Sequence, residues 1–346
     1  QSYKQSIALA MHDILDGNEN AVLLGQGVSD QTRIFGTTVE LIEKFGKERV
    51  IDMPIMEEGM TGIAIGMALN GLYPVQTHIR VDFLILAMNQ LVNMAAKYRY
   101  MYGGAFEVPM LIRAVVGRSW GQGPQHSQSL QSLFSHIPGL TVIMPSTAED
   151  AYNSYLYAAT YYKNPVLSIE HRFLYDLTFQ STSDPDRKKS PFLARFVQKG
   201  DDITIVATSY MVQEAQRASA WLKERSQLTC EIIDLHRVSQ IDHNVILNSI
   251  KKTGLLIVAD TSWKEYGVVA EVCRGVLEHA PHLMKKPMIS LGMQPSPCPT
   301  SHVLEDAFYP DMSDLIQAIA QLTETEMEAP SKAYAKSLRK QFRGPF

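Results

Sequence analysis

Residues 54–66 read PIMEEGMTGIAIG, a stretch that sets two carboxylates, Glu57 and Glu58, among apolar side chains. A carboxylate in apolar surroundings must be paired, hydrogen-bonded or changed in its proton affinity. The simplest role for either acid is to cap the helix that opens here, since acids are favoured at helix N-termini. Glu57 follows an apolar run directly and is predicted to face inward, whereas Glu58 is predicted to be solvated or to cap the helix. A buried glutamate is suited to donating or sharing a proton near neutral pH.

Three glycines in the same stretch, Gly59, Gly62 and Gly66, recur at helical spacing. Glycines three, four and seven positions apart remove the side chains from one helix face, so another body can approach that face closely. The stretch therefore predicts a buried acid beside a tight interface.

Length and composition restrict the class of protein. A chain of 346 residues favours two domains, and 45% hydrophobic with 20% charged residues is typical of a globular rather than a disordered chain. The net charge of −4 gives no electrostatic reason to expect nucleic acid or a membrane surface as partner. No apolar run approaches the ~18 residues of a membrane span. Three cysteines without CxxC spacing fit a reducing compartment, so we expect a cytoplasmic protein, or a mitochondrial matrix protein in a eukaryote.

Short apolar runs alternate with helical patterns, which predicts an α/β fold with mostly parallel sheets. A capping box at Ser146–Glu149 is predicted to open a helix with one apolar face, and the apolar segment Asp82–Tyr102 is predicted to be a helix that ends at Gly103 and Gly104. The predicted strands are Ala21–Leu24, Val75–His78, Met110–Val116, Thr141–Met144, Val166–Ile169, Ile203–Ala207, Cys230–Asp234, Leu255–Ala259 and Met288–Ser290.

A polar, proline-bearing and non-periodic segment follows the first series of strands and indicates an interdomain linker. We therefore predict a first domain at 1–180, a linker at 181–200, a second domain at 201–325 and a C-terminal tail at 326–346.

A glycine-rich loop at 117–128 follows the predicted strand Met110–Val116. In open α/β sheets, ligands bind beyond the carboxyl ends of the strands. His126 in this loop can act as an acid or a base near pH 7, although a lone loop histidine is more often structural. The chain has no Ser-His-Asp order and no G-x-S-x-G, so a hydrolase is not indicated.

A second candidate region follows the strand Val75–His78. An aromatic residue at a strand-to-helix turn, here Phe83, is most often part of the core, and the functional alternative is a platform that stacks on a flat heterocycle. Arg80 could equally pair with Asp82 or accept an anionic group of a substrate. The chain has no GxGxxG after a strand, no P-loop and no metal-ligand spacing. If a phosphorylated cofactor is used, we expect another chain to hold its phosphates.

Several motifs in order resemble the beta subunit of the thiamine-diphosphate-dependent first component of 2-oxo-acid dehydrogenases. That group includes the pyruvate, branched-chain and acetoin enzymes and lies within the transketolase-like superfamily. The resemblance runs from about residue 5 to about residue 320. The motifs are DMPIMEEG at 52–59, NMAAK at 93–97, YMYGG at 100–104, GPQHSQ at 123–128, IPGL at 137–140 and GDDITIVAT at 200–208.

The resemblance implies a transketolase-like pyrimidine-binding domain followed by a transketolase C-terminal domain. It also implies an alpha chain that carries the diphosphate and Mg²⁺ site, in an assembly of two alpha and two beta chains that share thiamine diphosphate. By position, Glu57 matches the glutamate that bonds N1′ of the aminopyrimidine, and Phe83 matches the aromatic packed on that ring. His126 matches the histidine associated with substrate handling and acyl transfer to a lipoyl group. The resemblance further admits K⁺ near Tyr157–Asn164 and a lipoyl-bearing acyltransferase as partner.

Two positions depart from the family pattern. The family commonly has Gly-Glu-Asp after the first strand, whereas this chain has Gln26 at that cofactor-binding position, and a glutamine cannot titrate. Arg80 stands beside the pyrimidine site where relatives usually have a small or neutral residue, so a cation there suits an anionic or phosphorylated substrate.

These observations favour the beta subunit of a thiamine-diphosphate-dependent enzyme that decarboxylates a 2-oxo acid and transfers the acyl unit to a lipoyl or other acceptor. One alternative is a split transketolase-like carboligase that transfers an acyl or two-carbon unit to an aldehyde or sugar. Another is a non-catalytic scaffold subunit, against which the retention of Glu57, Phe83 and His126 argues.

Overall fold

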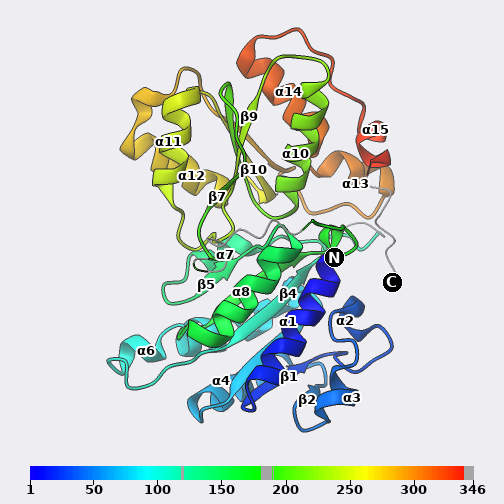
Figure 1. Cartoon of the computed structure of the whole chain (residues 1–346), viewed down its shortest axis with the longest axis vertical. Coiled ribbons are helices and arrows are strands. Elements are labelled where there is room, and N and C mark those ends of the chain that lie inside the picture. The colour runs from blue at the N-terminus through cyan, green and yellow to red at the C-terminus, as the bar shows by residue number, and fades with distance from the viewer. Residues whose placement is uncertain (118–120, 181–188, 190, 339–346) are drawn as a thin grey trace. The chain divides into compact units, whose positions relative to one another are not determined.

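The computed structural model describes residues 1–117, 121–180, 189 and 191–338. It divides into two compact units, the first formed by Gln1–Gly117 with Leu133–Phe192 and the second by Arg118–Ser132 with Leu193–Phe346. Each unit contains one sheet with helices packed against it, so the predicted α/β class is confirmed (Figure 1). Residues 121–132, which fall in the predicted first domain, group with the second unit.

The first unit has a six-stranded sheet in the order β2-β1-β3-β4-β6-β5, in which every neighbouring pair is parallel. All carboxyl ends of its strands therefore lie at the same edge. The strands are β1 (Ala21–Gly25), β2 (Val50–Asp52), β3 (Tyr73–His78), β4 (Leu111–Val116), β5 (Thr141–Ile143) and β6 (Val166–His171).

Two long helices, α1 (Tyr3–Gly17) and α8 (Ala148–Tyr161), lie side by side over one face of this sheet (Figure 1). The helix α4 (Glu57–Leu69) packs against β3. The shorter elements are α2 (Arg33–Gly36), α3 (Leu41–Phe45), α5 (Val81–Leu84), η1 (Ile85–Ala87), η2 (Gln90–Ala95), α6 (Tyr98–Met101), α7 (Gln131–Ser135) and η3 (Arg172–Leu174).

Two helix predictions in this unit are wrong in detail. The helix α8 has Thr147 as its N-cap, whose hydroxyl accepts a hydrogen bond from the amide of Asp150 at 3.2 Å, so the cap lies one residue after the predicted Ser146. The segment 82–102 is not one helix, because it divides into α5, η1, the π-helical η2 and α6. Its predicted end is confirmed, since Gly103 and Gly104 have φ values of 61° and 84°.

The second unit has a five-stranded sheet in the order β11-β10-β8-β9-β7, parallel except for the antiparallel pair β7–β9. Helices cover both faces, with α10 and α14 on one and α11 and α12 on the other (Figure 1). The strands are β7 (Arg195–Gln198), β8 (Ile203–Ala207), β9 (Cys230–Asp234), β10 (Leu256–Trp263) and β11 (Ile289–Met293). The helices are α10 (Tyr210–Lys223), α11 (His243–Thr253), α12 (Val268–His279), η4 (Pro281–Leu283), α13 (His302–Phe308), α14 (Met312–Thr323) and α15 (Lys332–Ser337).

Most of the predicted linker, at 181–188 and 190, lies outside the described residues, as does the chain end at 339–346. Near the end of the predicted linker, β7 forms an edge strand that was not predicted. No helix of the described residues has both the length and the apolar character that crossing a membrane requires.

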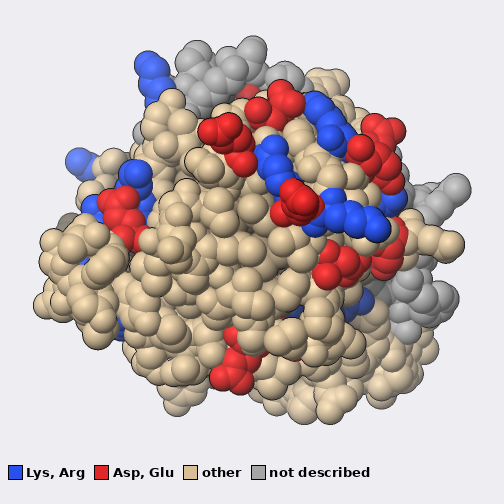
Figure 2. Space-filling model, turned by 90° about the horizontal axis from the view of Figure 1, so that it is seen from below, with Lys and Arg blue, Asp and Glu red and all other residues tan. Residues whose placement is uncertain are grey.

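Charged side chains are unevenly spread over the molecular surface. On the face shown in Figure 2, most of the lysine, arginine, aspartate and glutamate side chains gather toward one side, and smaller charged groups lie apart from them.

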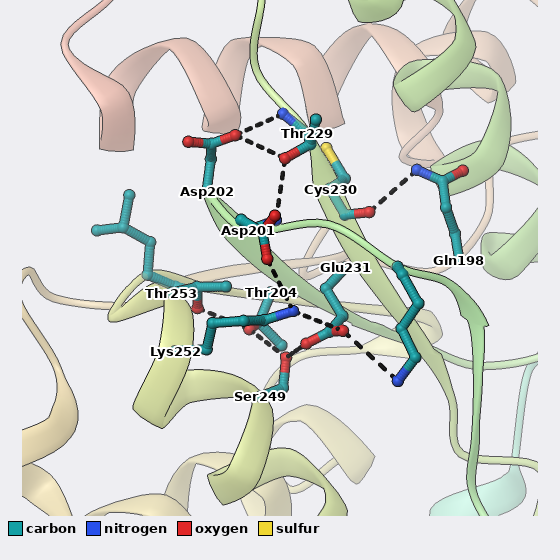
Figure 3. A network of polar contacts seen from close by, with 12 residues as sticks. Gln198, Asp201, Asp202, Thr204, Thr229, Cys230, Glu231, Ser249, Lys252 and Thr253 are labelled. Atoms are coloured by element: carbon teal, nitrogen blue, oxygen red, sulfur yellow. Dashed lines mark hydrogen bonds and ion pairs between the residues drawn. The ribbon is translucent and has the colours of Figure 1, made fainter.

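A polar network in the second unit fixes α11 to the amino-terminal part of its sheet (Figure 3). The buried carboxylate of Glu231 on β9 accepts hydrogen bonds from Ser249 Oγ at 2.7 Å and Lys252 Nζ at 2.9 Å. The hydroxyl of Thr204 on β8 bonds both Ser249 and Thr253. Because every hydroxyl and charge in this network has a partner, its role is to secure the fold.

Candidate active site

The carboxyl edge of the first sheet gathers the candidate residues of the first unit. Gln26 follows the end of β1, Glu57 begins α4 after β2, and Arg80 stands two residues after β3. Ligands of open parallel sheets bind at this edge.

Glu57 is the first residue of α4, and its side chain is buried with 6% exposure. One carboxylate oxygen, Oε1, accepts a hydrogen bond from Nε2 of Gln26 at 3.1 Å. Its backbone carbonyl accepts from Thr61 Oγ1 at 2.8 Å, and Thr61 in turn accepts from Gln76 Nε2 of β3 at 2.7 Å. The acid is therefore held at a helix N-terminus, which stabilises its negative charge. Glu58 is exposed and accepts from Gln90 Nε2 at 3.0 Å.

The loop that carries Gln26 is held by Asp52 at the end of β2. Asp52 accepts hydrogen bonds from the amide of Gly27 at 3.0 Å and from the hydroxyl of Ser29 at 2.6 Å. Gly27 adopts a φ of 70°, which glycine reaches without strain. This local turn directs the chain so that the Gln26 amide reaches the Glu57 carboxylate.

Phe83 lies in α5, and 38% of it is exposed. A core position would bury such a large apolar ring, so its exposure leaves a flat apolar surface in contact with solvent at this edge. Phe83 and Arg80 are brought to the edge by the same short turn after β3.

Arg80 makes few contacts with the rest of the chain. Its Nη1 donates to the carbonyl of its neighbour Ile79 at 2.9 Å, and its guanidinium lies 5.6 Å from the ring centre of Phe35. Burial lowers the pKa of Arg80, and the nearby charge of Asp82 offsets part of that effect. Asp82 is the carboxylate whose charge acts on Arg80, and both roles that the sequence left open for Arg80 stay predictions.

His126 belongs to the second unit and is half-buried there. Its loop is fixed to the end of β10, where Ser262 Oγ donates to the carbonyl of Ser129 at 2.7 Å and Gln131 Nε2 donates to the carboxylate of Asp260 at 2.9 Å. Burial raises the pKa of Asp260, and hydrogen bonds from Thr208 and from Gln131 counteract this shift. The structure thus joins Gln26 with Glu57 and places Phe83 and Arg80 in one turn, whereas His126 is held by a different set of contacts.

Sequence reasoning missed several residues at these edges. Phe35, Arg172 and Asp260 were not singled out, although Arg172 directly follows β6 and Asp260 lies in the carboxyl half of β10. A charged residue that follows a predicted parallel strand is a signal that could have identified Arg172.

The residues of the first unit fit an aminopyrimidine group. A buried carboxylate can bond a ring nitrogen, and only one of its oxygens is engaged by Gln26. An exposed phenylalanine offers the apolar face on which a flat ring packs. These two features are the chemistry that a pyrimidine site requires.

Comparison with known proteins agrees with this fit. The model of the transketolase pyrimidine-binding domain matches residues 1–178, and that of the transketolase C-terminal domain matches residues 193–315. A solved structure described as a split gene transketolase, inactive beta4 tetramer, superimposes with a TM-score of 0.76, covering 94% of this chain and 99% of that one. At 20% identity this likeness concerns the fold.

Curated relatives match over most of the chain. The mitochondrial pyruvate dehydrogenase E1 component subunit beta of Saccharomyces cerevisiae is 32% identical over 326 residues, which are 93% of this chain and 89% of the relative. The Bos taurus protein of the same name is 33% identical over 322 residues, 91% of this chain and 89% of the relative. The pyruvate dehydrogenase E1 component subunit beta of Rhizobium meliloti is 31% identical over 316 residues, 91% of this chain and 68% of the relative. With two transketolase-like domains and such relatives, the chain belongs to the family of E1 component beta subunits of 2-oxo-acid dehydrogenases.

Proposed function

We propose that this chain is the beta subunit of a thiamine-diphosphate-dependent enzyme that decarboxylates a 2-oxo acid and passes the acyl unit to a lipoyl or other acceptor. It acts with an alpha subunit in an assembly of two alpha and two beta chains. The observation that carries the proposal is the buried carboxylate of Glu57, held by Gln26 at the carboxyl edge of a parallel sheet. Membership in the E1 beta family supports it.

The roles of the individual side chains follow from their chemistry. Glu57 holds a proton at N1′ of the aminopyrimidine, and Gln26 fixes the carboxylate for that contact by donating to its other oxygen. Phe83 packs on the face of the pyrimidine ring. When bound, thiamine diphosphate supplies the nucleophilic carbon and the electron sink for decarboxylation. His126 handles the substrate and the acyl transfer as an acid or base.

The proposal assigns the diphosphate and its Mg²⁺ to the alpha chain, because this sequence has no phosphate-binding motif. K⁺ near Tyr157–Asn164 and a lipoyl-bearing acyltransferase as acceptor are parts of the proposal that rest on family resemblance. The relatives from yeast and cattle are named mitochondrial, so we propose the mitochondrial matrix in a eukaryote and the cytoplasm in a bacterium.

An exposed apolar surface around α4 and η1 supports the partner assignment. Ile55 is 85% exposed and Leu86 is 59% exposed, and Ile63 and Ile85 are also exposed. Large apolar side chains grouped in this way mark interaction sites in soluble proteins. We propose that other chains of the assembly cover this surface.

The test is turnover of a 2-oxo acid by the complex copurified with its alpha chain, with thiamine diphosphate and Mg²⁺ supplied. Glu57→Gln keeps the shape of the side chain but cannot hold the proton, so we expect turnover to fall about 10²- to 10⁴-fold while the complex still assembles. Glu58→Gln is the matched control, because Glu58 is exposed, and its turnover should stay near the wild-type value. Near-normal turnover of the Glu57→Gln complex would contradict the assignment.

The acceptor separates this function from the carboligase alternative. Reduction of a lipoyl domain or of an artificial oxidant in step with decarboxylation supports a dehydrogenase component. Carbon–carbon bond formation with an aldehyde or sugar, without that reduction, supports the carboligase. A complex that turns over neither but needs this chain for assembly would indicate a scaffold subunit.

A further inference from the structure

The helix α4, which carries Glu57, begins without a side-chain cap. Its N-cap residue is Met56, whose side chain has no oxygen and makes no capping hydrogen bond within the described chain. Glu57 accepts a hydrogen bond from Gln26, outside the helix. Glu58 likewise accepts from Gln90. The first turn of α4 therefore depends on other contacts to keep its position.

Two glycines weaken the start of this helix further. Gly59 is the third residue of α4 and Gly62 is the sixth. Glycine is a poor helix former because it loses more backbone freedom on folding than any other residue. An uncapped helix end with glycines at these positions would fray in isolation, and a frayed turn would move the carboxylate of Glu57.

A buried pair of side chains ties this first turn to the sheet. Thr61 Oγ1 donates to the backbone carbonyl of Glu57 at 2.8 Å, and the same oxygen accepts from Gln76 Nε2 at 2.7 Å. Thr61 and Gln76 are both 0% exposed. Because the hydroxyl accepts from an amide while it donates to a carbonyl, the two bonds polarise and strengthen each other. Gln76, Thr61 and the carbonyl of Glu57 thus form a hydrogen-bonded relay from β3 to α4.

The strand that carries one end of the relay is held on both sides. Gln76 lies within β3, in register with Leu24 of β1 on one side and with Ile112 of β4 on the other. Each of these neighbours is joined to β3 by a parallel ladder of backbone hydrogen bonds. The relay therefore connects Glu57 to a firmly held part of the sheet.

The relay has features that stability alone does not explain. Gln76 Oε1 is buried and has no hydrogen-bond partner among the described residues. A buried acceptor without a partner is unfavourable, whereas apolar side chains of the same shape at both positions would be nearly neutral or stabilising. A helix threonine that bonds the carbonyl four residues earlier, as Thr61 does, also slightly destabilises and bends its helix. These features favour a role in placing Glu57.

We propose that Thr61 and Gln76 are positioning residues that fix the Glu57 carboxylate for its contact with N1′ of the aminopyrimidine. The proposal rests on the proposed function, because it takes that contact as the task of Glu57. The carbonyl and the side chain of Glu57 leave the same Cα, so the relay fixes one end of the residue while Gln26 fixes carboxylate oxygen Oε1. Since a displacement of about 1 Å can lower a rate about 10²-fold, loss of one of these two holds should slow the reaction.

The experiment measures kcat and KM for a 2-oxo acid, and the midpoint of thermal unfolding, on the assembled alpha–beta complex. Thr61→Val keeps the volume but removes the hydroxyl, so we expect kcat to fall about 10- to 100-fold while KM changes less than about twofold. Thr61→Ser keeps the hydroxyl and removes a methyl group, so it should lower the unfolding midpoint and leave kcat within about twofold of wild type.

Thr323→Val is the matched control for this pair. Thr323 Oγ1 donates to the carbonyl of Ile319 at 2.8 Å, the same kind of bond in α14 of the second unit, so its loss should leave kcat unchanged. A normal kcat in Thr61→Val overturns the proposal. So does a kcat that falls equally in Thr61→Val and Thr61→Ser, because the hydroxyl would then not be the group that matters.

Substitution of Gln76 separates a relay from two independent contacts. Gln76→Met removes the amide donor but leaves the bond from Thr61 to Glu57, so we expect a smaller loss of kcat, about 3- to 10-fold. The double variant Thr61→Val with Gln76→Met should lose no more kcat than Thr61→Val alone, because the amide acts only through the hydroxyl. Losses that multiply in the double variant overturn the relay.

Hydrogen exchange distinguishes failure of the relay from failure of the proposed function. If the wild-type complex turns over no 2-oxo acid, the proposed function fails, and amide exchange over residues 57–66 of the complex then tests the relay by itself. Exchange there should be about five- to tenfold faster in Thr61→Val than in wild type, and near the wild-type rate in Thr61→Ser. That result supports the hold on Glu57, and equal exchange in wild type and Thr61→Val overturns it.

Discussion

At the residue scale, the contact between Gln26 and Glu57 explains the departure from the family pattern after the first strand. A carboxylate at position 26 would place two acids within hydrogen-bond reach, and such pairs share a proton and titrate together. The amide of Gln26 instead donates to Glu57 at 3.1 Å and carries no titratable proton. Glu57 therefore keeps a fixed hydrogen-bond donor at every pH. A proton path through position 26 is not available to this chain.

His78 provides a prediction for the pH dependence of stability. It is 1% exposed at the end of β3, both ring nitrogens lack hydrogen-bond partners among the described residues, and burial lowers its pKa from 6.5 to about 3. The unfolded chain therefore binds a proton between pH 6.5 and 3 that the folded chain does not. His78 costs no stability above pH 6.5, and its cost grows as the pH falls, to about 2 kcal/mol at pH 5.

Urea unfolding of His78→Leu and wild type at pH 7.5 and pH 5 checks this prediction. The variant should gain about 2 kcal/mol relative to wild type on going from pH 7.5 to pH 5. His282→Leu is the control, because His282 is exposed and should show no such gain. An equal pH dependence of wild type and His78→Leu would show that His78 is protonated in the folded protein.

At the scale of the elements, the glycine face of α4 predicts an effect on assembly. A side chain at Gly62 or Gly66 would meet nothing of the described chain within 4 Å. Gly66→Leu should therefore stabilise the isolated chain by about 0.7 kcal/mol through helix propensity. It should also weaken assembly with the alpha chain, because the added side chain occupies the space that the partner needs.

Chemical unfolding and analytical ultracentrifugation measure these two effects separately. Gly17→Leu is the control for assembly, since Gly17 also has no neighbour within 4 Å and ends a different helix, α1. If Gly66→Leu assembles like wild type, the glycine face of α4 is not buried between subunits.

Helices and strands were predicted correctly where the sequence has a clear apolar pattern. They were missed where contacts with other parts of the chain determine the local structure. The nine predicted strands match strands of the structure, because each is a short apolar run between turn signals. The strands β2 and β7 were missed, since β2 has three residues and β7 is a polar edge strand with one charged end. The helix predicted at 82–102 is interrupted by the π-helical segment η2, and an apolar composition alone does not reveal such a change of hydrogen bonding.

At the scale of the whole molecule, the sequence indicated single candidate residues but not their neighbours in space. Glu57 was identified because an acid among apolar residues is unusual. Phe35 and Arg172 were not, because their relation to Arg80 arises only when the chain connections bring positions 35, 80 and 172 to one sheet edge. The grouping of residues 121–132 with the second unit depends on hydrogen bonds such as that from Gln131 to Asp260, which leave no periodic signal.

The proposed division of the cofactor between two chains yields a prediction for the molecule as a whole. In the proposed site Glu57 and Phe83 contact the aminopyrimidine, and the sequence has no motif for a diphosphate. Since the phosphates and their Mg²⁺ carry most of the charge that a protein can recognise, the pyrimidine contacts alone should give weak binding. Calorimetry should detect no binding of thiamine diphosphate to the isolated chain with a Kd below ~1 µM, which corresponds to about −8 kcal/mol.

The complex with the alpha chain should bind thiamine diphosphate more tightly than the isolated chain does. Glu57→Gln in that complex should weaken this binding less than it lowers turnover, because the proton at N1′ matters most in the reaction. Tight binding by the isolated chain would mean that the phosphates are held here, by residues that carry no recognisable motif.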